Sequence, residues 1–205
     1  MIKSVIFDYG NVISFPNPLT YCDELERKTG VPASVFKKLY DRIRSEYDRG
    51  TITGEQMYSQ LLEENGYDRI AADKKLMAEL TRIDLESWSH IRPDVTEWGL
   101  TLQKSGYKLG ILSNMPTEFL DLYEKQIPLF TAADYACFSC RLHLIKPEKT
   151  IYRVCLEKLG VAPDEAVFFD DIKTNVDAAN ILGIHGCLWT GLDQGKKDWQ
   201  QFIGS

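Results

Sequence analysis

The chain has 205 residues, of which 44% are hydrophobic and 26% charged, and its formal net charge at neutral pH is −6. This length suits one large domain or a core with a smaller insertion, and the composition is ordinary for a soluble globular protein. The acidic balance argues against a general nucleic-acid or anionic-membrane surface, while a local pocket for a small anion remains compatible with it.

Cellular location is indicated by what the sequence lacks. No apolar run approaches the length that spans a membrane, and a strand pattern starts so early that we expect no secretion signal. The five cysteines are odd in number and irregularly spaced, which favours reduced thiols. We therefore expect a cytoplasmic protein without a membrane or nucleic-acid partner. A monomer and a homodimer are both left open.

The first predicted element is a strand over residues 3–8. Its apolar run ends in one carboxylate, Asp8, followed by Gly10 and Asn11, two residue types that tolerate unusual backbone angles. In open α/β sheets, ligands bind beyond the carboxyl ends of the strands, which is where this pattern places Asp8. Taken alone the signal is weak, because an Asp after a strand is more often a turn residue.

Residues 15–90 are predicted to be almost entirely helical. The expected helices run from Asn17 (the cap) and Pro18 to about Gly30, from Pro32 along an apolar stripe, from the capping box Thr53–Gln56 to about Gly66, and over residues 69–81. This block separates the first strand from the rest of the sheet. We therefore expect a helical subdomain over 15–90, inserted into a core made of 1–14 and 91–205.

The pattern beyond residue 90 alternates between helix and strand. Helices are predicted over 95–104, from Pro116 to about 126, over 148–159 and over 174–182; strands are predicted over 108–112, 135–138, 166–169 and 187–189. Such alternation is typical of a parallel sheet with helices on both faces. The predicted fold class is therefore α/β.

Three of these strands end in polar residues. They deliver Asp8, the pair Ser113-Asn114 and the pair Asp170-Asp171 to one edge of a parallel sheet, and Lys146 lies in a loop that can reach this edge. Carboxylates that gather in one place raise each other's pKa unless a cation lies among them. Mg²⁺ fits this role, since it is usually held by one or two carboxylates together with substrate phosphate.

The same edge offers groups for an anion. The Lys146 ammonium, the Ser113 hydroxyl and the backbone amides of the helix opened by Pro116 can all donate to anion oxygens. Phosphate is the anion that uses all of these donors. The residues alone therefore indicate a phosphate and magnesium site.

Four ordered motifs carry a family resemblance. They are Phe-Asp-x-Gly-Asn-Val-Ile (7–13), Leu-Ser-Asn (112–114), Lys-Pro (146–147) and Phe-Phe-Asp-Asp-x-x-x-Asn (168–175). Their order and spacing resemble the haloacid dehalogenase superfamily of aspartate-nucleophile hydrolases, over residues 3–14 and 92–189. The resemblance implies a Rossmann-like parallel-sheet core with an all-helical cap between the first two motifs. Residues 170–175 resemble the phosphatase domain of soluble epoxide hydrolase, and residues 8–13 resemble a bacterial α-D-glucose-1-phosphate phosphatase.

The resemblance implies a role for each motif residue. Asp8 would attack phosphorus, and Mg²⁺ would be held by an Asp8 oxygen, the Gly10 carbonyl and Asp171, with Asp170 behind them or bound through water. The phosphoryl-binding residues would be Ser113 and Asn114, with Gly10 beside them; Lys146 would neutralise the nucleophile and the phosphate, and Asn175 would orient the second carboxylate.

One position departs from the family pattern. Gly10 stands where the family usually has a second Asp, which serves as general acid and base. Loss of such a group typically lowers the rate by about 10²–10⁴-fold. Either the enzyme is slow, a substrate group or water substitutes, or the cap supplies the acid.

The leading functional hypothesis is a Mg²⁺-dependent phosphatase for a small phosphorylated metabolite, such as the sugar phosphate glucose 1-phosphate. The alternatives are a metal-independent 2-haloacid dehalogenase, a phosphomutase, and a phosphate-binding regulatory domain with little turnover. Two further sets are weaker candidates: the insertion residues Arg42, Arg44, Tyr47 and Arg49 for substrate contact, and Cys137, Cys140 and His143, whose spacing resembles a metal site.

Overall fold

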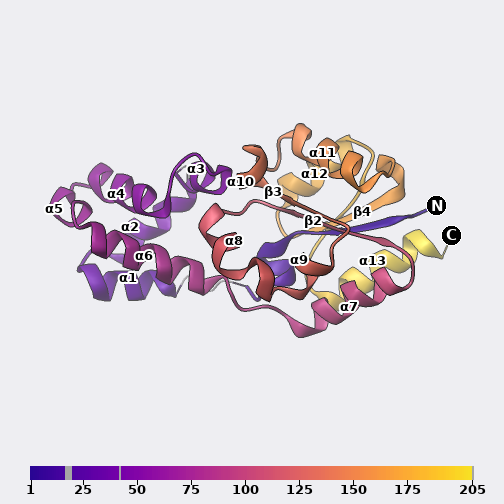
Figure 1. Ribbon diagram of the computed structural model, residues 1–205, viewed down its shortest axis with the longest axis horizontal. Coiled ribbons are helices and arrows are strands. Elements are labelled where there is room, and N and C mark those ends of the chain that lie inside the picture. Colours follow the sequence, from indigo (N-terminus) through magenta and orange to yellow (C-terminus); the bar gives the residue numbers. More distant parts are fainter. Residues whose placement is uncertain (17–19, 42, 205) are drawn as a thin grey trace.

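The computed structural model describes residues 1–16, 20–41 and 43–204 (Figure 1). The expected helix start at Asn17 and Pro18, and Arg42, lie outside these ranges. A five-stranded sheet, in which every neighbouring pair is parallel, has the order β3-β2-β1-β4-β5. Its strands are β1 (Ser4–Phe7), β2 (Lys108–Ser113), β3 (Tyr135–Phe138), β4 (Ala166–Asp170) and β5 (His185–Leu188).

Helices α1 to α6 precede residue 90, and α7 to α13 follow it. The first set is α1 (Tyr21–Thr29), α2 (Ala33–Lys37), α3 (Ile43–Arg49), α4 (Gly54–Glu64), α5 (Asp68–Ala71) and α6 (Lys74–Ser87). The second set is α7 (Pro93–Lys104), α8 (Thr117–Tyr123), α9 (Pro128–Ala132), α10 (Ser139–Leu142), α11 (Lys149–Leu159), α12 (Lys173–Ile181) and α13 (Leu192–Ile203). Short turns of helix cover Tyr9–Ile13, Lys38–Asp41, Glu124–Gln126 and Pro163–Glu165.

The sheet is buried between two layers of helices because its strands are apolar on both faces. Along β1, Val5 and Phe7 belong to one hydrophobic cluster, and Ile6 between them belongs to another. In Figure 1, α11 and α12 cover the upper face of the sheet, and α7 and α13 cover the lower face. This is the expected Rossmann-like α/β fold. Because β1 is central, its carboxyl end lies between those of β2 and β4.

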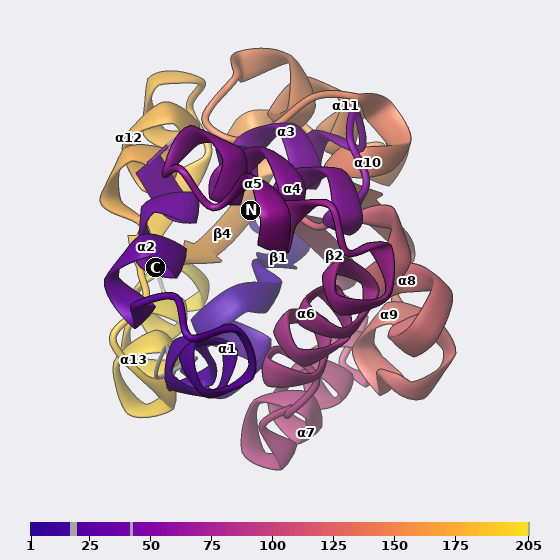
Figure 2. The same cartoon turned by 90° about the vertical axis from the view of Figure 1, so that its left-hand side faces the viewer.

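The described residues 20–41 and 43–88 form a block that we call the helical insert. It has apolar side chains of its own, such as the buried Leu25, Phe36 and Leu80. Figure 2, which looks at the insert, shows it in front of the strands. The two chain segments leading into and out of it are paired, since Phe15 N donates to His90 O and Arg92 N donates to Ile13 O, each at 2.8 Å. The division into a core and a separate domain over 15–90 stays a prediction.

Several element boundaries match the expectation. The capping box that opens α4 is present, β3 covers the predicted residues, and α1 and α11 end at Gly30 and Gly160, both of which have a positive φ. The helix predicted over 69–81 is in fact two, because Asp73 caps a new helix by accepting from the backbone of Lys75 and Leu76.

Three short or polar helices were not predicted. Helices α9 and α10 are too short for their apolar spacing to show a period. Helix α13 contains Gly195, which sequence reasoning counts against a helix. A Cβ at Gly195 would lie 2.4 Å from the Trp189 ring, so close packing explains this glycine. Among the described residues, no helix is long and apolar enough to cross a membrane.

Candidate active site

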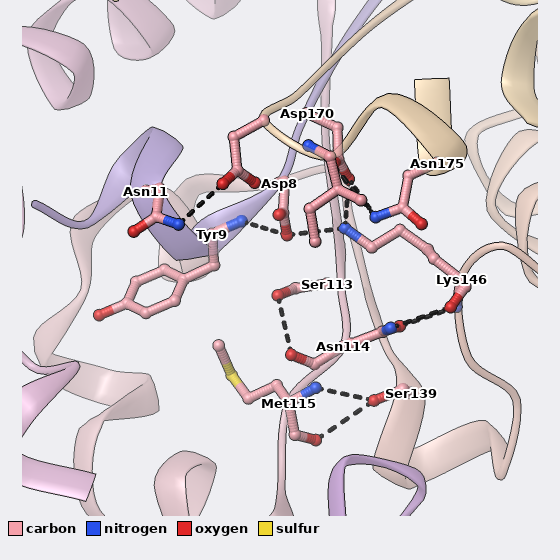
Figure 3. A network of polar contacts seen from close by, with 12 residues as sticks. Asp8, Tyr9, Asn11, Ser113, Asn114, Met115, Ser139, Lys146, Asp170 and Asn175 are labelled. Atoms are coloured by element: carbon pink, nitrogen blue, oxygen red, sulfur yellow. Dashed lines mark hydrogen bonds and ion pairs between the residues drawn. The ribbon is translucent and has the colours of Figure 1, made fainter. Parts of the chain in front are cut away.

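Strand β1 delivers Asp8 to the carboxyl edge of the sheet. Its Oδ1 accepts a hydrogen bond from the backbone N–H of Tyr9 at 2.6 Å and lies 2.8 Å from Nζ of Lys146. Asp8 is only 6% exposed. A carboxylate held in this way has a fixed orientation, and Figure 3 shows it pointing towards the side chain of Lys146.

The turn after Asp8 brings in a residue that sequence reasoning did not assign to the site. Asn11 has a φ of +57°, in the left-handed region that Asn adopts more easily than most residues. Its side-chain Nδ2 donates to Asp171 Oδ2 at 2.7 Å. The Asn in Asp-x-Gly-Asn was visible as a turn residue, but its partner 160 positions later was not.

Asp170 is the most fully bonded carboxylate of the site. It accepts from Lys146 Nζ at 2.6 Å, from Asn175 Nδ2 at 3.1 Å on both oxygens, and from the backbone N–H of Ile172 at 2.8 Å. It is completely buried. Asn175, predicted to orient the second carboxylate, therefore contacts Asp170 and not Asp171.

Lys146 joins the first and fourth strands through its ammonium, which contacts both Asp8 and Asp170 (Figure 3). Its own loop is held by Asn114: the Lys146 N–H donates to Asn114 Oδ1 at 2.8 Å, and Asn114 Nδ2 donates to the Lys146 carbonyl at 3.1 Å. The side-chain amide of Asn114 thus positions the lysine. The adjacent Ser113 hydroxyl is buried beside the same network.

The charges of the network perturb one another. Burial raises the pKa of Asp8 to about 7; the Asp170 and Asp171 carboxylates add to this rise, while Lys146 opposes it. Burial and Asp170 also raise the pKa of Asp171. Burial alone would lower the pKa of Lys146, but the Asp170 and Asp8 carboxylates outweigh it and raise that pKa. When ionised, the three carboxylates therefore carry more negative charge than the single ammonium of Lys146 can balance.

The donor set suits a hard divalent cation. Asp8, Asp170 and Asp171 each offer an oxygen within 4.8 Å of the others, and this is the one such group of His, Cys, Asp or Glu side chains in the described residues. Oxygen ligands are those that Mg²⁺ prefers. The oxygens of Asp170 already accept from nitrogen donors, which makes Asp8 and Asp171 the better placed ligands.

The network opens into a cavity of about 190 Å³. The predicted residues Asp8, Gly10, Ser113, Asn114, Lys146, Asp171 and Asn175 all line it, whereas Asp170 lies behind them. The helical insert contributes Arg44, Asp48 and Trp88 to the lining. The remaining lining comes from Tyr9, Asn11, Met115, Pro116, Phe119 and Ile172.

Of the three weaker insert candidates that lie within the described residues, one reaches this cavity. Arg44 lines it, while Tyr47 is buried away from it and Arg49 pairs with Glu148 at 2.6 Å. Asp48 and Trp88 were missed, because nothing in their sequence surroundings sets them apart from other helix residues.

The haloacid dehalogenase-like hydrolase family matches residues 2–183 of the chain. Acyl-CoA dehydrogenase family member 10 of Mus musculus is 28% identical over 98% of this chain, and bifunctional epoxide hydrolase 2 of Sus scrofa is 24% identical over 99% of it. The chain spans only 19% and 39% of the length of these two relatives. A putative phosphatase of Bacillus subtilis is 27% identical, with 90% of this chain and 81% of the relative aligned.

Solved structures share the fold. A HAD family enzyme of Bacteroides thetaiotaomicron, in complex with magnesium and inorganic phosphate, has a TM-score of 0.73 at 20% identity and covers 96% of this chain and 99% of its own. An L-2-haloacid dehalogenase has a TM-score of 0.64 at 20% identity and covers 90% of this chain and 82% of its own. At such identities the likeness concerns the fold alone.

Proposed function

This chain belongs to the haloacid dehalogenase-like hydrolases, and from that membership we propose that it is a Mg²⁺-dependent phosphatase acting on small phosphorylated metabolites. The observation that carries the proposal is the buried contact of Lys146 with both Asp8 and Asp170, beside a third carboxylate at Asp171. A nucleophilic carboxylate, a fixed cation and an oxygen-only metal site together suit an anionic phosphoryl group.

In the proposed reaction Asp8 attacks phosphorus and forms an aspartyl-phosphate, which water then hydrolyses. Lys146 holds the nucleophile and neutralises the phosphoryl oxygens, and the Ser113 hydroxyl donates to one of them. Asp8, Asp171 and the Gly10 carbonyl would hold Mg²⁺, which would neutralise phosphoryl charge and orient the group for attack. Asn175 and Asn11 keep the Asp170 and Asp171 carboxylates in place.

We further propose that the helical insert acts as a cap that sets substrate size. A cavity of about 190 Å³ excludes large partners, and the wall that the insert contributes offers a donor at Arg44 and an acceptor at Asp48. Such a wall suits a hydroxylated leaving group, which makes sugar phosphates such as glucose 1-phosphate the first substrates to try. Relatives described as phosphatases, and a neighbour that binds magnesium and phosphate, support this assignment.

A metal-independent 2-haloacid dehalogenase is the second candidate, because a solved dehalogenase shares the fold. It would use Asp8 on carbon. The crowded carboxylates at Asp170 and Asp171 favour the phosphatase, since attack on carbon has no need of a divalent cation. A phosphomutase would transfer the phosphoryl group between sugar positions, and a phosphate-binding domain would bind the ligand with little or no release of phosphate.

The test is a panel of hexose, pentose and nucleoside phosphates, assayed with the purified chain in Mg²⁺ and in EDTA. We expect phosphate release that requires Mg²⁺ and that falls about 10³-fold or more in Asp8→Asn. The control is the thermal unfolding of that variant, which shows whether it is folded. Undiminished activity in Asp8→Asn, or halide release from 2-chloropropionate without metal, would overturn the proposal. Phosphate transfer between sugar positions would indicate a mutase.

A further inference from the structure

We propose that Asp48, on helix α3 of the helical insert, is the general acid and base of this site. It would donate the proton to the leaving group and accept one from water, the role that the family pattern gives to an Asp at the position of Gly10. The inference rests on the proposed phosphatase function and names a catalytic residue for it. Four observations carry it: the place of Asp48 in the cavity, the anchoring of its backbone, the free oxygen of its carboxylate and its charge surroundings.

Asp48 lines the same cavity as Asp8 and Lys146, but it comes from helix α3 of the helical insert and not from the sheet edge. A proton donor for the leaving group should come from an element other than the one that carries the nucleophile, because the leaving oxygen departs away from the attacking carboxylate in an in-line displacement. Gly10 lies two residues after the nucleophile, where the family pattern has a second Asp, so the cavity has no carboxylate at that position. Among the described lining residues, the carboxylates are Asp8, Asp171 and Asp48, and the first two are engaged as nucleophile and proposed metal ligand.

The backbone of Asp48 is anchored to the sheet end. Its carbonyl accepts a hydrogen bond from the Ser139 hydroxyl, and the same hydroxyl accepts from the N–H of Met115 at 2.8 Å. Met115 directly follows the Ser113-Asn114 pair, and Figure 3 shows Ser139 beside it. Asp48 is therefore tied, through one side chain, to the loop that would hold the phosphoryl oxygens.

The next residue strengthens this anchor. Arg49 reaches Glu148 with Nη2 at 2.6 Å and donates to the His143 carbonyl with Nη1 at 3.0 Å, while His143 Nδ1 lies 3.1 Å from the Arg49 carbonyl. The contacts of Asp48 and of Arg49 together thus fix the carboxyl end of α3. A catalytic side chain needs such fixed placement, because small displacements reduce proton transfer strongly.

The carboxylate of Asp48 has one oxygen engaged and one available. Its Oδ1 accepts from Arg44 Nε at 3.0 Å, and Oδ2 forms no hydrogen bond with any described residue. The side chain is 15% exposed, and the cavity is the space that it lines. A buried acid that kept both oxygens occupied would have no position from which to transfer a proton.

Burial favours storage of a proton on Asp48, and the charged groups around it offset this only in part. Arg44 also binds the fully buried Asp84, at 2.9 and 3.1 Å, so one guanidinium serves two carboxylates. Burial raises the pKa of Asp48; Arg44 lowers it, Asp84 raises it, and the more distant Lys146 lowers it, with a net rise. A raised pKa lets a carboxyl group hold a proton nearer to neutral pH.

The proposed proton transfers balance over one turnover. As Asp8 forms its bond to phosphorus and the phosphorus–oxygen bond to the leaving group breaks, the protonated Asp48 gives its proton to the leaving oxygen. Asp48, now a carboxylate, then takes a proton from water as the water oxygen attacks phosphorus. The bond between Asp8 and phosphorus breaks, inorganic phosphate leaves, and both side chains return to their starting states.

The competing explanation is that Asp48 only accepts a hydrogen bond from a substrate hydroxyl. Two substrates without hydroxyl groups can separate these roles. Neither offers a hydroxyl for Asp48 to bind, but only one of them has a leaving group that needs a proton. p-Nitrophenyl phosphate releases a phenolate that needs no proton, whereas benzyl phosphate, of similar shape, releases an alkoxide that does. The experiment compares kcat/KM for these two probes in wild type and in Asp48→Asn, which keeps an oxygen for Arg44.

We expect Asp48→Asn to lower kcat/KM for benzyl phosphate by about 10²–10⁴-fold, and for p-nitrophenyl phosphate by less than about tenfold. A burst of p-nitrophenolate is also expected in this variant, because hydrolysis of the aspartyl-phosphate loses its base. Equal losses on both probes, or no loss on benzyl phosphate, would overturn the inference. Partial unfolding cannot imitate the expected result, since it scales both rates alike.

The matched control is Arg49→Gln, which weakens the same anchor but leaves the Asp48 carboxyl in place. Any loss in this variant should be equal on the two probes. If the wild type releases phosphate neither from the two probes nor from the sugar and nucleoside phosphates of the panel above, the proposed phosphatase function itself fails. If Asp8→Asn abolishes hydrolysis and Asp48→Asn affects both probes equally, the phosphatase function stands and the role of Asp48 falls.

Discussion

The ammonium of Lys146 lies 2.6 Å from Asp170 Oδ2, and both side chains are almost completely excluded from solvent. This contact connects the loop before α11 to the end of β4. The second contact of the same ammonium, to Asp8, makes Lys146 the shared counter-ion of two buried carboxylates. Its removal would leave two acids in a medium that disfavours charge.

We therefore expect Lys146→Met to lower the free energy of unfolding by about 3 kcal/mol at pH 8, as measured by urea denaturation. The loss arises because the neighbouring carboxylates stay buried without their cation. The double variant Lys146→Met with Asp170→Asn should recover part of it, since one of the uncompensated charges is removed. A variant as stable as the wild type would contradict this account of the network.

Asn11 is expected to control the affinity for Mg²⁺ through Asp171. Asn11→Gly removes the 2.7 Å hydrogen bond to Asp171 while tolerating the positive φ, and should weaken Mg²⁺ binding by about tenfold or more. Asn11→Ala should weaken it similarly and cost about 1 kcal/mol of stability besides, because Ala lacks the short polar side chain that lets Asn adopt the left-handed region. Mg²⁺ titrations followed by thermal unfolding measure both effects. Unchanged titration curves in both variants would exclude this role.

The stabilisation by Mg²⁺ should depend on pH. The pKa of Asp8 rises on folding, from an ordinary value of 3.8 to about 7, chiefly through burial. The folded, metal-free protein therefore favours protonated Asp8, and stability is lost as the pH rises from about 4 to 7. A cation that binds ionised Asp8 reverses this loss. The rise in melting temperature on adding Mg²⁺ should thus be larger at pH 8 than at pH 5.5, and this difference should shrink in Asp8→Asn.

Gly10→Asp should rescue the loss caused by Asp48→Asn. Gly10 has φ and ψ of −61° and 130°, which any residue adopts, and a Cβ there would lie 3.4 Å from the Trp88 ring. The new carboxyl would stand two residues after the nucleophile. We expect at least about tenfold recovery of benzyl phosphate hydrolysis. Gly10→Asn, of equal size but without an acid, serves as the control and should give none.

The parts of the site on strand ends were predictable because two independent patterns agreed there. A buried apolar run followed by polar residues identified Asp8, Ser113, Asn114, Asp170 and Asp171, and the parallel order of the strands placed them at one edge. The structure brings these residues together with Lys146, which rested mainly on the family resemblance. The variants described above test the catalytic and metal-binding roles proposed for these residues.

The contribution of the helical insert was not predictable. Asp48 lies among other charged residues of a helix, and neither periodicity nor spacing separates it from Asp41 or Glu46. Its position depends on Ser139, on a four-residue helix too short to recognise in the sequence. Tertiary contacts of this kind leave no local pattern, since the two partners are 91 positions apart.

The cavity therefore has walls of two separate origins. The nucleophile, the lysine and the carboxylate cluster come from segments outside residues 20–88, whereas Arg44, Asp48 and Trp88 come from within them. Recombination of this block with that of a relative would retarget the enzyme and exchange its proton donor in the same step. A chimaera that keeps turnover must then carry an acidic side chain at the position of Asp48, or regain one beside the nucleophile.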